Sequence, residues 1–336
     1  MNDPIIIAID AMGGDDSPNK VIEGISIHAK STNNVNYKIF GKKNLIEPLL
    51  TKYNLSKNRF DIIHTNNIVE GTDTPLTAAK KGKDTSLWLA VQSLKNDEAH
   101  AIVSAGNTGA LFLISKLNLK MIENIDKPAL SALWPNKSGM NVVLDLGANI
   151  ECSEKNLIDF AIMGSSLFKS LFPKEQPKVA LLNIGSEDIK GNETIKSAYK
   201  ILSEKKSNEF NFAGYIEGNN IMSGDVNVIV TDGFTGNIAL KTAEGTANFI
   251  MKEVKNSMTS NLYGKVLSFL NLKNLKKVKD KLDPRLYNGA ILIGLNSPVV
   301  KSHGSTDYIG FSNSLKVCEK IVNGNLIEKI KHNIID

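Results

Sequence analysis

The sequence predicts an α/β fold in which helices cover both faces of a mostly parallel β-sheet, giving three α/β/α layers. The first observation is that short apolar runs rich in Ile and Val alternate with helical patterns along the chain, as in proteins built from strand–helix–strand units. The second is that several of these runs end in turns rich in glycine and small polar residues. The 336 residues show no low-complexity linker, so we expect a single domain over residues 1–336.

The elements follow in order from these patterns. The expected strands are the apolar runs at 5–10, 37–40, 61–64, 101–104, 142–145, 178–182 and 226–230. Ser17 and Pro18 are expected to be the N-cap and the first residue of the first helix. A long helix is expected over 75–95, and another from Ala110. The stretch of about 245–283 is Lys-rich and amphipathic without a strand pattern, so we expect a helical excursion from the sheet.

Composition narrows the possible partners and the compartment. The formal net charge of +5 favours a phosphorylated ligand, an acidic protein or an anionic lipid surface. No zinc-finger spacing or aromatic-interleaved basic stripe indicates nucleic acid. Cys152 and Cys318 form no CxxC motif, so we expect reduced thiols. We recognise no signal peptide, and the apolar runs are too short for a membrane span, so we expect a cytoplasmic protein.

Four strand ends carry more glycine and small polar residues than helix caps alone require. They are DAMGGD (10–15), SAGNTGA (104–110), DLGAN (145–149) and TDGFTGN (231–237). Ligands of parallel sheets bind beyond the carboxyl ends of the strands, and glycine turns at helix N-termini suit an anion, above all phosphate. Each turn alone could be only a tight turn. The spacings match neither GxGxxG nor GxxxxGK[ST], so a dinucleotide site and a P-loop kinase are not supported.

No covalent nucleophile or metal site is indicated. The sequence has no GxSxG elbow, and its five histidines lack metal-ligand spacing such as HExxH. His303 is the most informative of the five, because it follows the apolar pair Val299–Val300 at another expected strand end. The alternative for His303 is a turn histidine that bonds the backbone.

At these turns the sequence resembles the PlsX phosphate acyltransferases. The resemblance extends from residue 5 to about 310 in the order and spacing of that family. Its motifs are IDAMGGD (9–15), SAGNTGALF (104–112), LDLGAN (144–149), LLNIGSEDIKGNE (181–193), YIEGNNI (215–221), DVNVIVTDGFTGNIALKTAEG (225–245) and KSHGSTD (301–307). The sequence departs from the family pattern at Lys80–Ser86, at Lys127 and around Asn288–Gly294. The first two departures replace guanidinium groups by amines.

The resemblance implies a fold, a reaction and partners. The fold would be like that of phosphotransacetylases and isocitrate dehydrogenase, in a homodimer. The reaction would transfer a long-chain acyl group from acyl carrier protein to inorganic phosphate, and the acyl phosphate would then feed a downstream glycerol-3-phosphate acyltransferase in phospholipid synthesis. No metal or organic cofactor is implied.

Such a reaction needs positioning, oxyanion stabilisation and help for the leaving thiolate. We expect the proton and charge chemistry at Asp232, Lys241, His303 and Lys190. Phosphate or substrate contacts are expected at Asp10, Gly13, Gly14, Gly106, Asn107, Thr108, Gly109, Asn149, Gly233, Thr235 and Asn237. Two alternatives stay open. The aspartates at strand ends, including Asp145, could simply cap turns, and the two lysines could be solvated surface charges.

The helical excursion has more than one interpretation. Val266, Leu267, Phe269 and Leu270 could dip into lipid while the lysines meet acidic headgroups, which the resemblance favours. The same face could instead pack at a dimer edge, bind acidic acyl carrier protein, or be a plain solvated helix. Two rival functions remain: a short-chain phosphotransacetylase that uses coenzyme A, and a non-catalytic scaffold for lipid enzymes. A dehydrogenase is a more distant alternative.

Overall fold

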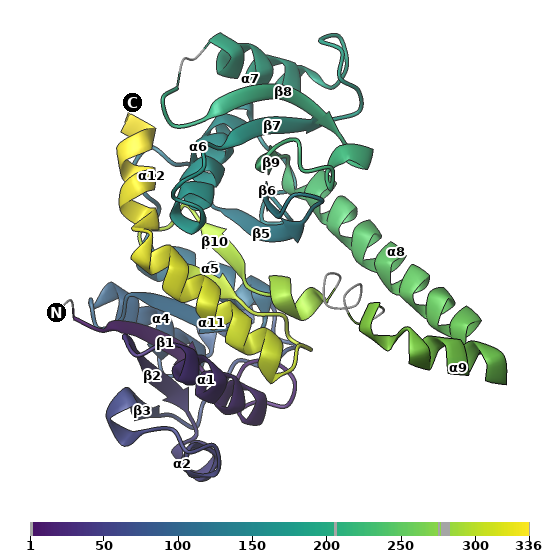
Figure 1. The fold of residues 1–336 in the computed structure, drawn as a ribbon. Helices are drawn as coiled ribbons and strands as arrows, with labels where there is room; N and C mark the ends of the chain where they lie inside the picture. Colours follow the sequence, from purple (N-terminus) through teal and green to yellow (C-terminus); the bar gives the residue numbers. More distant parts are fainter. Residues whose placement is uncertain (1–2, 205–206, 275, 277–282, 336) are drawn as a thin grey trace.

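The computed structural model describes residues 3–204, 207–274, 276 and 283–335, and the strands within them form one sheet of eleven (Figure 1). The strands are β1 (Ile5–Asp10), β2 (Val35–Gly41), β3 (Phe60–His64), β4 (Ala101–Ser104), β5 (Ala129–Pro135), β6 (Met140–Leu144), β7 (Lys178–Asn183), β8 (Asn211–Glu217), β9 (Val228–Val230), β10 (Ala290–Ile293) and β11 (Val299–Lys301).

Helices connect these strands. They are α1 (Asn19–Ser31), α2 (Lys43–Lys52), α3 (Pro75–Lys80), α4 (Ser86–Lys95), α5 (Thr108–Leu119), α6 (Glu154–Leu171), α7 (Glu193–Glu204), α8 (Gly233–Thr259), α9 (Leu262–Leu270), α11 (Tyr308–Asn323) and α12 (Leu326–Ile335). The described residues also include the short 3₁₀ segments η1 (Lys57–Arg59), η2 (Gly218–Asn220) and η3 (Pro284–Tyr287).

The sheet consists of two parallel halves joined by an antiparallel seam. The strand order is β3-β2-β1-β4-β11-β10-β5-β6-β9-β7-β8. Pairing is parallel from β3 to β11 and again from β6 to β8, while β10 and β5 pair antiparallel with both of their neighbours. Three reversals separate the halves, so the strands of one half run opposite to those of the other. The carboxyl ends of the predicted strands therefore fall into two groups.

Helices cover both faces of the sheet, as predicted. On one face, α1, α2, α6, α7, α11 and α12 pack in one continuous core that includes Val21, Ile46, Phe160, Ala198, Phe311 and Leu326. On the other face, α4 and α5 cover the first half through Leu87 and Ile114. The second half is covered there by the segment around Ile221 and by the start of α8. The expected α/β/α layering is confirmed.

The end of the chain completes the first half of the sheet. After building β5 to β9, the chain returns through β10 and inserts β11 beside β4. It then lays α11 along α1 (Figure 1). Residues 299–323 thus reach the turns after β1 and β4, and the segment 301–307 joins the region that the sequence predicts as a site.

Two local predictions are wrong. The stretch 75–95 is two helices, α3 and α4, because Gly82 adopts a left-handed φ of 123° and Thr85 caps α4 by accepting from the Trp88 N–H. The first helix begins at Asn19 with Pro18 as its cap residue, and the Ser17 hydroxyl donates to the Gly13 carbonyl instead of capping it. The first error comes from the backbone conformation of Gly82, and the second from a serine hydroxyl that bonds another carbonyl instead of the helix.

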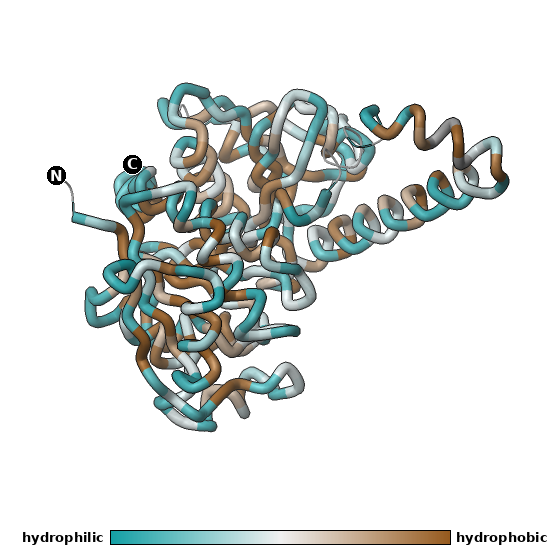
Figure 2. The backbone as a smooth tube through the Cα atoms, turned by 60° about the horizontal axis from the view of Figure 1, so that its bottom comes forward, coloured by the Kyte–Doolittle hydropathy of each residue, from teal (hydrophilic) through white to brown (hydrophobic). Residues whose placement is uncertain are grey.

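The predicted helical excursion projects from the body as α8 and α9 (Figures 1 and 2). With 27 residues, α8 is about 40 Å long at 1.5 Å per residue. Residues 275 and 277–282 of the predicted excursion, and the side chain of Leu267, lie outside the described residues. In the described part of the chain, no helix is long and apolar enough to cross a membrane.

Candidate functional site

The first group of turns surrounds the carboxyl ends of β1, β4 and β11. The Asp15 N–H donates to the Gly304 carbonyl at 3.0 Å, and the Ser302 N–H donates to the Ser104 carbonyl at 2.9 Å. A Cβ on Gly13 would lie 2.5 Å from the Gly106 nitrogen, so only glycine allows the two turns to meet. The predicted residues Gly13, Gly14 and Gly106 therefore lie together, beside the segment 302–305.

The carboxylate of Asp10 connects these turns by hydrogen bonds. Its carboxylate accepts from the hydroxyl of Ser86 at 2.8 Å, from the hydroxyl of Ser104 at 2.7 Å, and from the Met12 N–H at 3.3 Å. Burial raises the pKa of Asp10, and these hydrogen bonds oppose the rise. The side chain is buried, so in this arrangement Asp10 organises the turns.

The N-terminus of α5 supplies the predicted residues Asn107, Thr108 and Gly109. Asn107 caps the helix by accepting from the Ala110 N–H at 3.0 Å. Its amide donates to the carbonyls of Gly71 and Asp73 at 3.0 and 2.9 Å. The side chain therefore fastens the loop before α3 to the start of α5, and this loop borders the turn.

Two buried lysines lie beneath the first group, and the sequence analysis missed both. Lys20 is 3% exposed and donates to the Gly304 carbonyl. Lys301 is 9% exposed and donates to the carbonyls of Ala105, at 3.3 Å, and Ser302. In the described residues neither ammonium makes an ion pair with a carboxylate. The only sequence features that could have indicated these lysines are weak, because Lys301 ends an apolar strand and Lys20 lies in the first turn of a helix.

The second group of turns joins β6 and β9 to the start of α8. Asp145 accepts from four backbone N–H groups, of Leu130, Gly147, Ala148 and Asn149, at 2.8–3.2 Å. The amide of Asn149 donates to Asp145 and to the Pro128 carbonyl. Burial raises the pKa of Asp145, opposed by these bonds. Asp145 therefore caps the turn after β6, which is one of the two roles that the sequence left open for it.

The start of α8 holds the other predicted residues of this group. The Gly233 N–H donates to the Asn149 carbonyl at 2.8 Å. Asp232 is the N-cap, and its two carboxylate oxygens accept from the N–H and the hydroxyl of Thr235, both at 2.8 Å. Asn237 is exposed one turn later, next to Gly147. The carboxylate of Asp232 is thus already used by its own helix.

Electrostatics connect the two groups through α8. His303, in the first group, is exposed, and its Nδ1 lies 3.0 Å from the Ser305 hydroxyl. Its pKa is lowered first by burial and then by Lys301, while Glu244 opposes this and Lys241 adds to it. Lys241 and Glu244 form an ion pair at 2.7 Å on α8. The helix α8 starts in the second group of turns, and its charged side chains Lys241 and Glu244 therefore act on the pKa of His303 in the first group.

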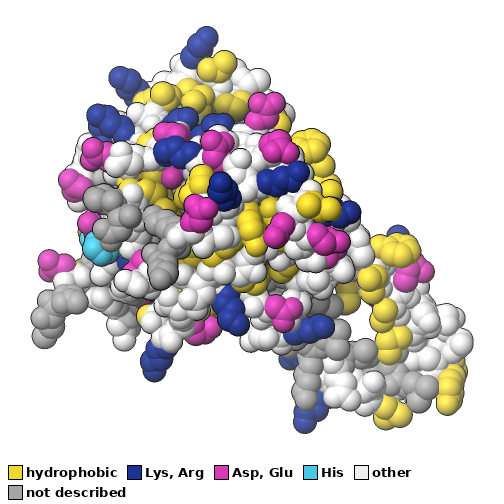
Figure 3. Space-filling view, turned by 90° about the horizontal axis from the view of Figure 1, so that it is seen from above, with side chains coloured by type: hydrophobic (Ala, Val, Ile, Leu, Met, Phe, Trp, Pro, Cys, Tyr) yellow, Lys and Arg dark blue, Asp and Glu magenta, His cyan; other side chains and the backbone are white. Residues whose placement is uncertain are grey.

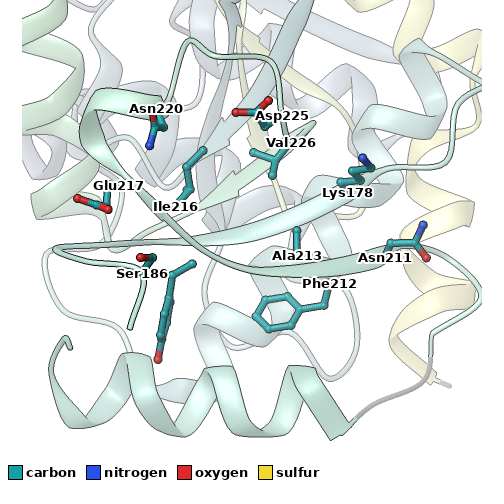
Figure 4. Close-up of a pocket in the computed structure, with 11 residues that line it drawn as sticks. Lys178, Ser186, Asn211, Phe212, Ala213, Ile216, Glu217, Asn220, Asp225 and Val226 are labelled. Carbon is teal, nitrogen blue, oxygen red and sulfur yellow. The ribbon is translucent and has the colours of Figure 1, made fainter. Parts of the chain in front are cut away.

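The hydrogen bonds of Lys190 are made within its own loop and with the end of β7, and not with either group of turns. It belongs to the loop after β7, where its N–H donates to the Glu187 carbonyl at 2.9 Å and its carbonyl accepts from Asn183. A pocket of about 450 Å³ at the β7–β8 edge is lined by Lys178, Ser186, Ile216, Glu217 and neighbouring residues (Figure 4), and includes none of the predicted site residues. No group of three His, Cys, Asp or Glu that could hold a metal occurs in the described residues.

A family model described as fatty acid synthesis protein matches residues 5–329. The chain belongs to this family. A phosphate acyltransferase of Pelagibacter ubique is 67% identical over 334 residues, covering 99% of this chain and all of that protein. Another phosphate acyltransferase, of Rhodospirillum rubrum, is 42% identical, covering 99% of this chain and 95% of that protein. The predicted family and acyltransferase class are confirmed.

Solved structures support the fold. A phosphotransacetylase of Staphylococcus aureus superposes with a TM-score of 0.62 at 17% identity, covering 96% of this chain and 94% of that one. A branched-chain phosphotransacylase of Enterococcus faecalis gives 0.59 at 14% identity, covering 95% and 99%. At these identities the likeness concerns the fold alone, and it confirms the predicted phosphotransacetylase-like architecture of this member of the fatty acid synthesis protein family.

Proposed function

We propose that this protein transfers a long-chain fatty acyl group from acyl carrier protein to inorganic phosphate and releases acyl phosphate for phospholipid synthesis. Membership of the family and the curated phosphate acyltransferases at 67% and 42% identity support it. The observation that carries the site is the meeting of three glycine turns around Gly13, Gly106 and Gly304, beside an exposed histidine and two buried lysines. Positive charge and close backbone approach suit a phosphate acceptor.

The chemistry needs no covalent enzyme intermediate. An oxygen of HPO₄²⁻ attacks the thioester carbonyl carbon, the C–S bond breaks, and the phosphate proton ends on the departing thiolate. We assign that proton transfer to His303. Its lowered pKa keeps the imidazole neutral at pH 7, so it can accept the phosphate proton and donate it to sulfur. Lys241, on α8, stabilises the oxyanion.

The partners in this proposal are acyl carrier protein, a second copy of the chain and the membrane surface. Support comes from the projecting α8–α9 pair, where hydrophobic side chains gather (Figure 3). Phe249, Val266, Phe269 and Leu270 are all exposed there, near Lys273. An apolar face with lysines suits either a homodimer or acidic lipid. The protein would work in the cytoplasm at the inner face of the membrane and pass acyl phosphate to a glycerol-3-phosphate acyltransferase.

The deciding experiment is acyl-phosphate formation by purified protein from long-chain acyl carrier protein and inorganic phosphate. We expect turnover that saturates with phosphate. Turnover of acetyl coenzyme A alone would replace this proposal with a short-chain phosphotransacetylase. No turnover of either donor by folded protein would leave a scaffold for lipid enzymes.

A further inference from the structure

Lys20 and Lys301 are buried charges at the candidate site to which the acyl-transfer steps above assign no individual role. Lys20 projects from α1 and Lys301 ends β11, yet both ammonium groups reach carbonyls of the first group of turns, at Gly304, Ala105 and Ser302. Nine-tenths or more of each residue is buried. Both lysines therefore point into the place where the turns 11–15, 104–106 and 302–305 meet.

Carbonyl oxygens satisfy hydrogen bonds but do not neutralise two positive charges. A buried ammonium is costly unless it is paired with an anion. The carboxylate that acts on Lys301 is Asp10, which is buried, and its single negative charge can offset only one of the two ammonium groups. The carboxylates that act on Lys20 are Asp15 and Asp16, which are exposed and therefore screened by water. The junction keeps an excess of buried positive charge.

We propose that Lys20 and Lys301 together bind the phosphate substrate at this junction of the three turns. That the anion is phosphate rests on the proposed function, while the presence of an anion site rests on the two lysines. Glycine at positions 13, 14, 106 and 304 places no side chain over this junction, and Gly14 and His303 are exposed at its rim, so a small anion can approach it from solvent. His303 lies on the same turn as Gly304, so a phosphate on the lysines is next to the group assigned to its proton.

The two lysines also make the binding depend on pH. Burial, and then Lys20, lower the pKa of Lys301 to about 8, and Asp10 opposes this. Burial lowers the pKa of Lys20, opposed by Asp15 and Asp16. Inorganic phosphate is already a dianion well above its second pKa, which is of the order of the value of about 6 for a phosphate ester. From about pH 8 upward the ligand charge is therefore constant while Lys301 loses its proton. Phosphate affinity falls over this range, and binding takes up a proton.

Titration calorimetry of the full-length protein with inorganic phosphate alone tests this without any acyl donor. Measurements at pH 7.5 to 9.5, in two buffers of different ionisation enthalpy, give both the Kd and the protons taken up. Lys20→Met and Lys301→Met each remove one charge-assisted hydrogen bond, so we expect the Kd to rise about ten- to a hundredfold. In Lys301→Met the loss of affinity is also expected to move to higher pH, because Lys20 no longer has a cationic neighbour.

Lys169→Met is the matched control, since Lys169 is a half-buried lysine paired with Glu209 at 2.8 Å outside both groups of turns. Its Kd for phosphate is expected to be that of the wild type. Circular dichroism of each variant shows whether it is folded, and Lys301→Gln, which also removes the charge, replaces the methionine variant if that one does not fold. An unchanged Kd and pH profile in folded Lys20 and Lys301 variants overturns the site.

The acyl-transfer assay separates this inference from the proposed function. Acyl phosphate formation with a normal phosphate KM in both methionine variants leaves the function standing and overturns the lysine site. Lysine-dependent phosphate binding by a protein that forms no acyl phosphate supports the site and overturns the function. Wild-type protein that binds no phosphate up to high millimolar concentration overturns the site.

Discussion

His303 is exposed, and charged groups on β11, α8 and α1 affect its pKa. His303→Gln removes the proposed proton transfer but keeps a polar side chain, so we expect kcat to fall about 100-fold or more with the phosphate KM little changed. Because its pKa lies below the usual 6.5, the neutral imidazole is lost only as the pH falls below 6.5. The acid limb of the kcat profile should lie there and disappear in the variant.

The control for this prediction is His332→Gln, which changes an exposed histidine on α12. A variant that keeps the wild-type kcat and acid limb would show that another group moves the proton.

Asp232 differs from His303 because its carboxylate caps α8. Asp232→Ala removes both bonds to Thr235, and we expect a loss of about 1 kcal/mol in the free energy of unfolding. Asp232→Asn keeps an acceptor at the cap and should lose only a small part of that. Urea unfolding of the three proteins measures the difference. Equal losses in the two variants would mean that the cap bonds contribute nothing.

Only some of the site residues could be found from the sequence. Gly13, Gly106 and Asn107 stand in turns after recognisable strands, and their residue types already suggest close approach and capping. Lys20 and Lys301 could not be found in this way. Inside the protein their ammonium groups donate to the carbonyls of Gly304 and Ala105, which come from other parts of the chain. A lysine in a helix or at a strand end ordinarily reaches solvent instead.

Among the elements, the strongly apolar parallel strands were predicted, and the strands that build the seam and one edge were not. β10 has four residues and β5 ends in Pro135, so neither gives the long apolar run of a buried parallel strand. β8 is an edge strand with exposed alternate residues and Gly214. The antiparallel seam was therefore not predictable, and with it the division of the four turns into two groups.

The α8–α9 pair offers a prediction about surfaces. Phe269 and Leu270 are 72% and 74% exposed, and lysines flank them. Phe269→Glu and Leu270→Glu should weaken binding to vesicles of acidic phospholipid by an order of magnitude or more. Each change puts a negative charge where an apolar side chain would enter the membrane surface. Vesicle sedimentation measures this. The control is Leu117→Glu, a 58% exposed leucine on α5.

The same variants distinguish a membrane surface from a dimer interface. Analytical ultracentrifugation without lipid should give one oligomeric state for wild type and both variants if Phe269 and Leu270 contact only lipid. Dissociation of the variants with unchanged vesicle binding would assign this face to a second copy of the chain.

At the scale of the whole molecule, the two ends of the chain are fastened together on one half of the sheet. The segment after β9 returns to place β11 beside β4, and α11 packs on α1. Under this contact, His28 of α1 bonds Tyr37 of β2 at 2.8 Å and Glu319 of α11 at 3.1 Å. The first half of the site therefore depends on the last quarter of the sequence, which is why its turns could be recognised separately but not assembled by sequence reasoning.

His28 makes this closure sensitive to acid. It is fully buried, and burial lowers its pKa to about 4, with Lys316 and Arg59 adding to the shift and Glu319 opposing it. The unfolded chain binds the proton near pH 6.5 and the folded chain only near pH 4, so stability is complete above 6.5 and falls as the pH decreases from 6.5 to 4. The loss for this one group is about 3 kcal/mol. His28→Gln cannot bind the proton, so urea unfolding at several pH values should show a shallower fall, by up to one proton, than in the wild type. Parallel curves would mean that His28 is protonated equally in the folded and unfolded chains, and that Glu319, rather than burial, sets its charge.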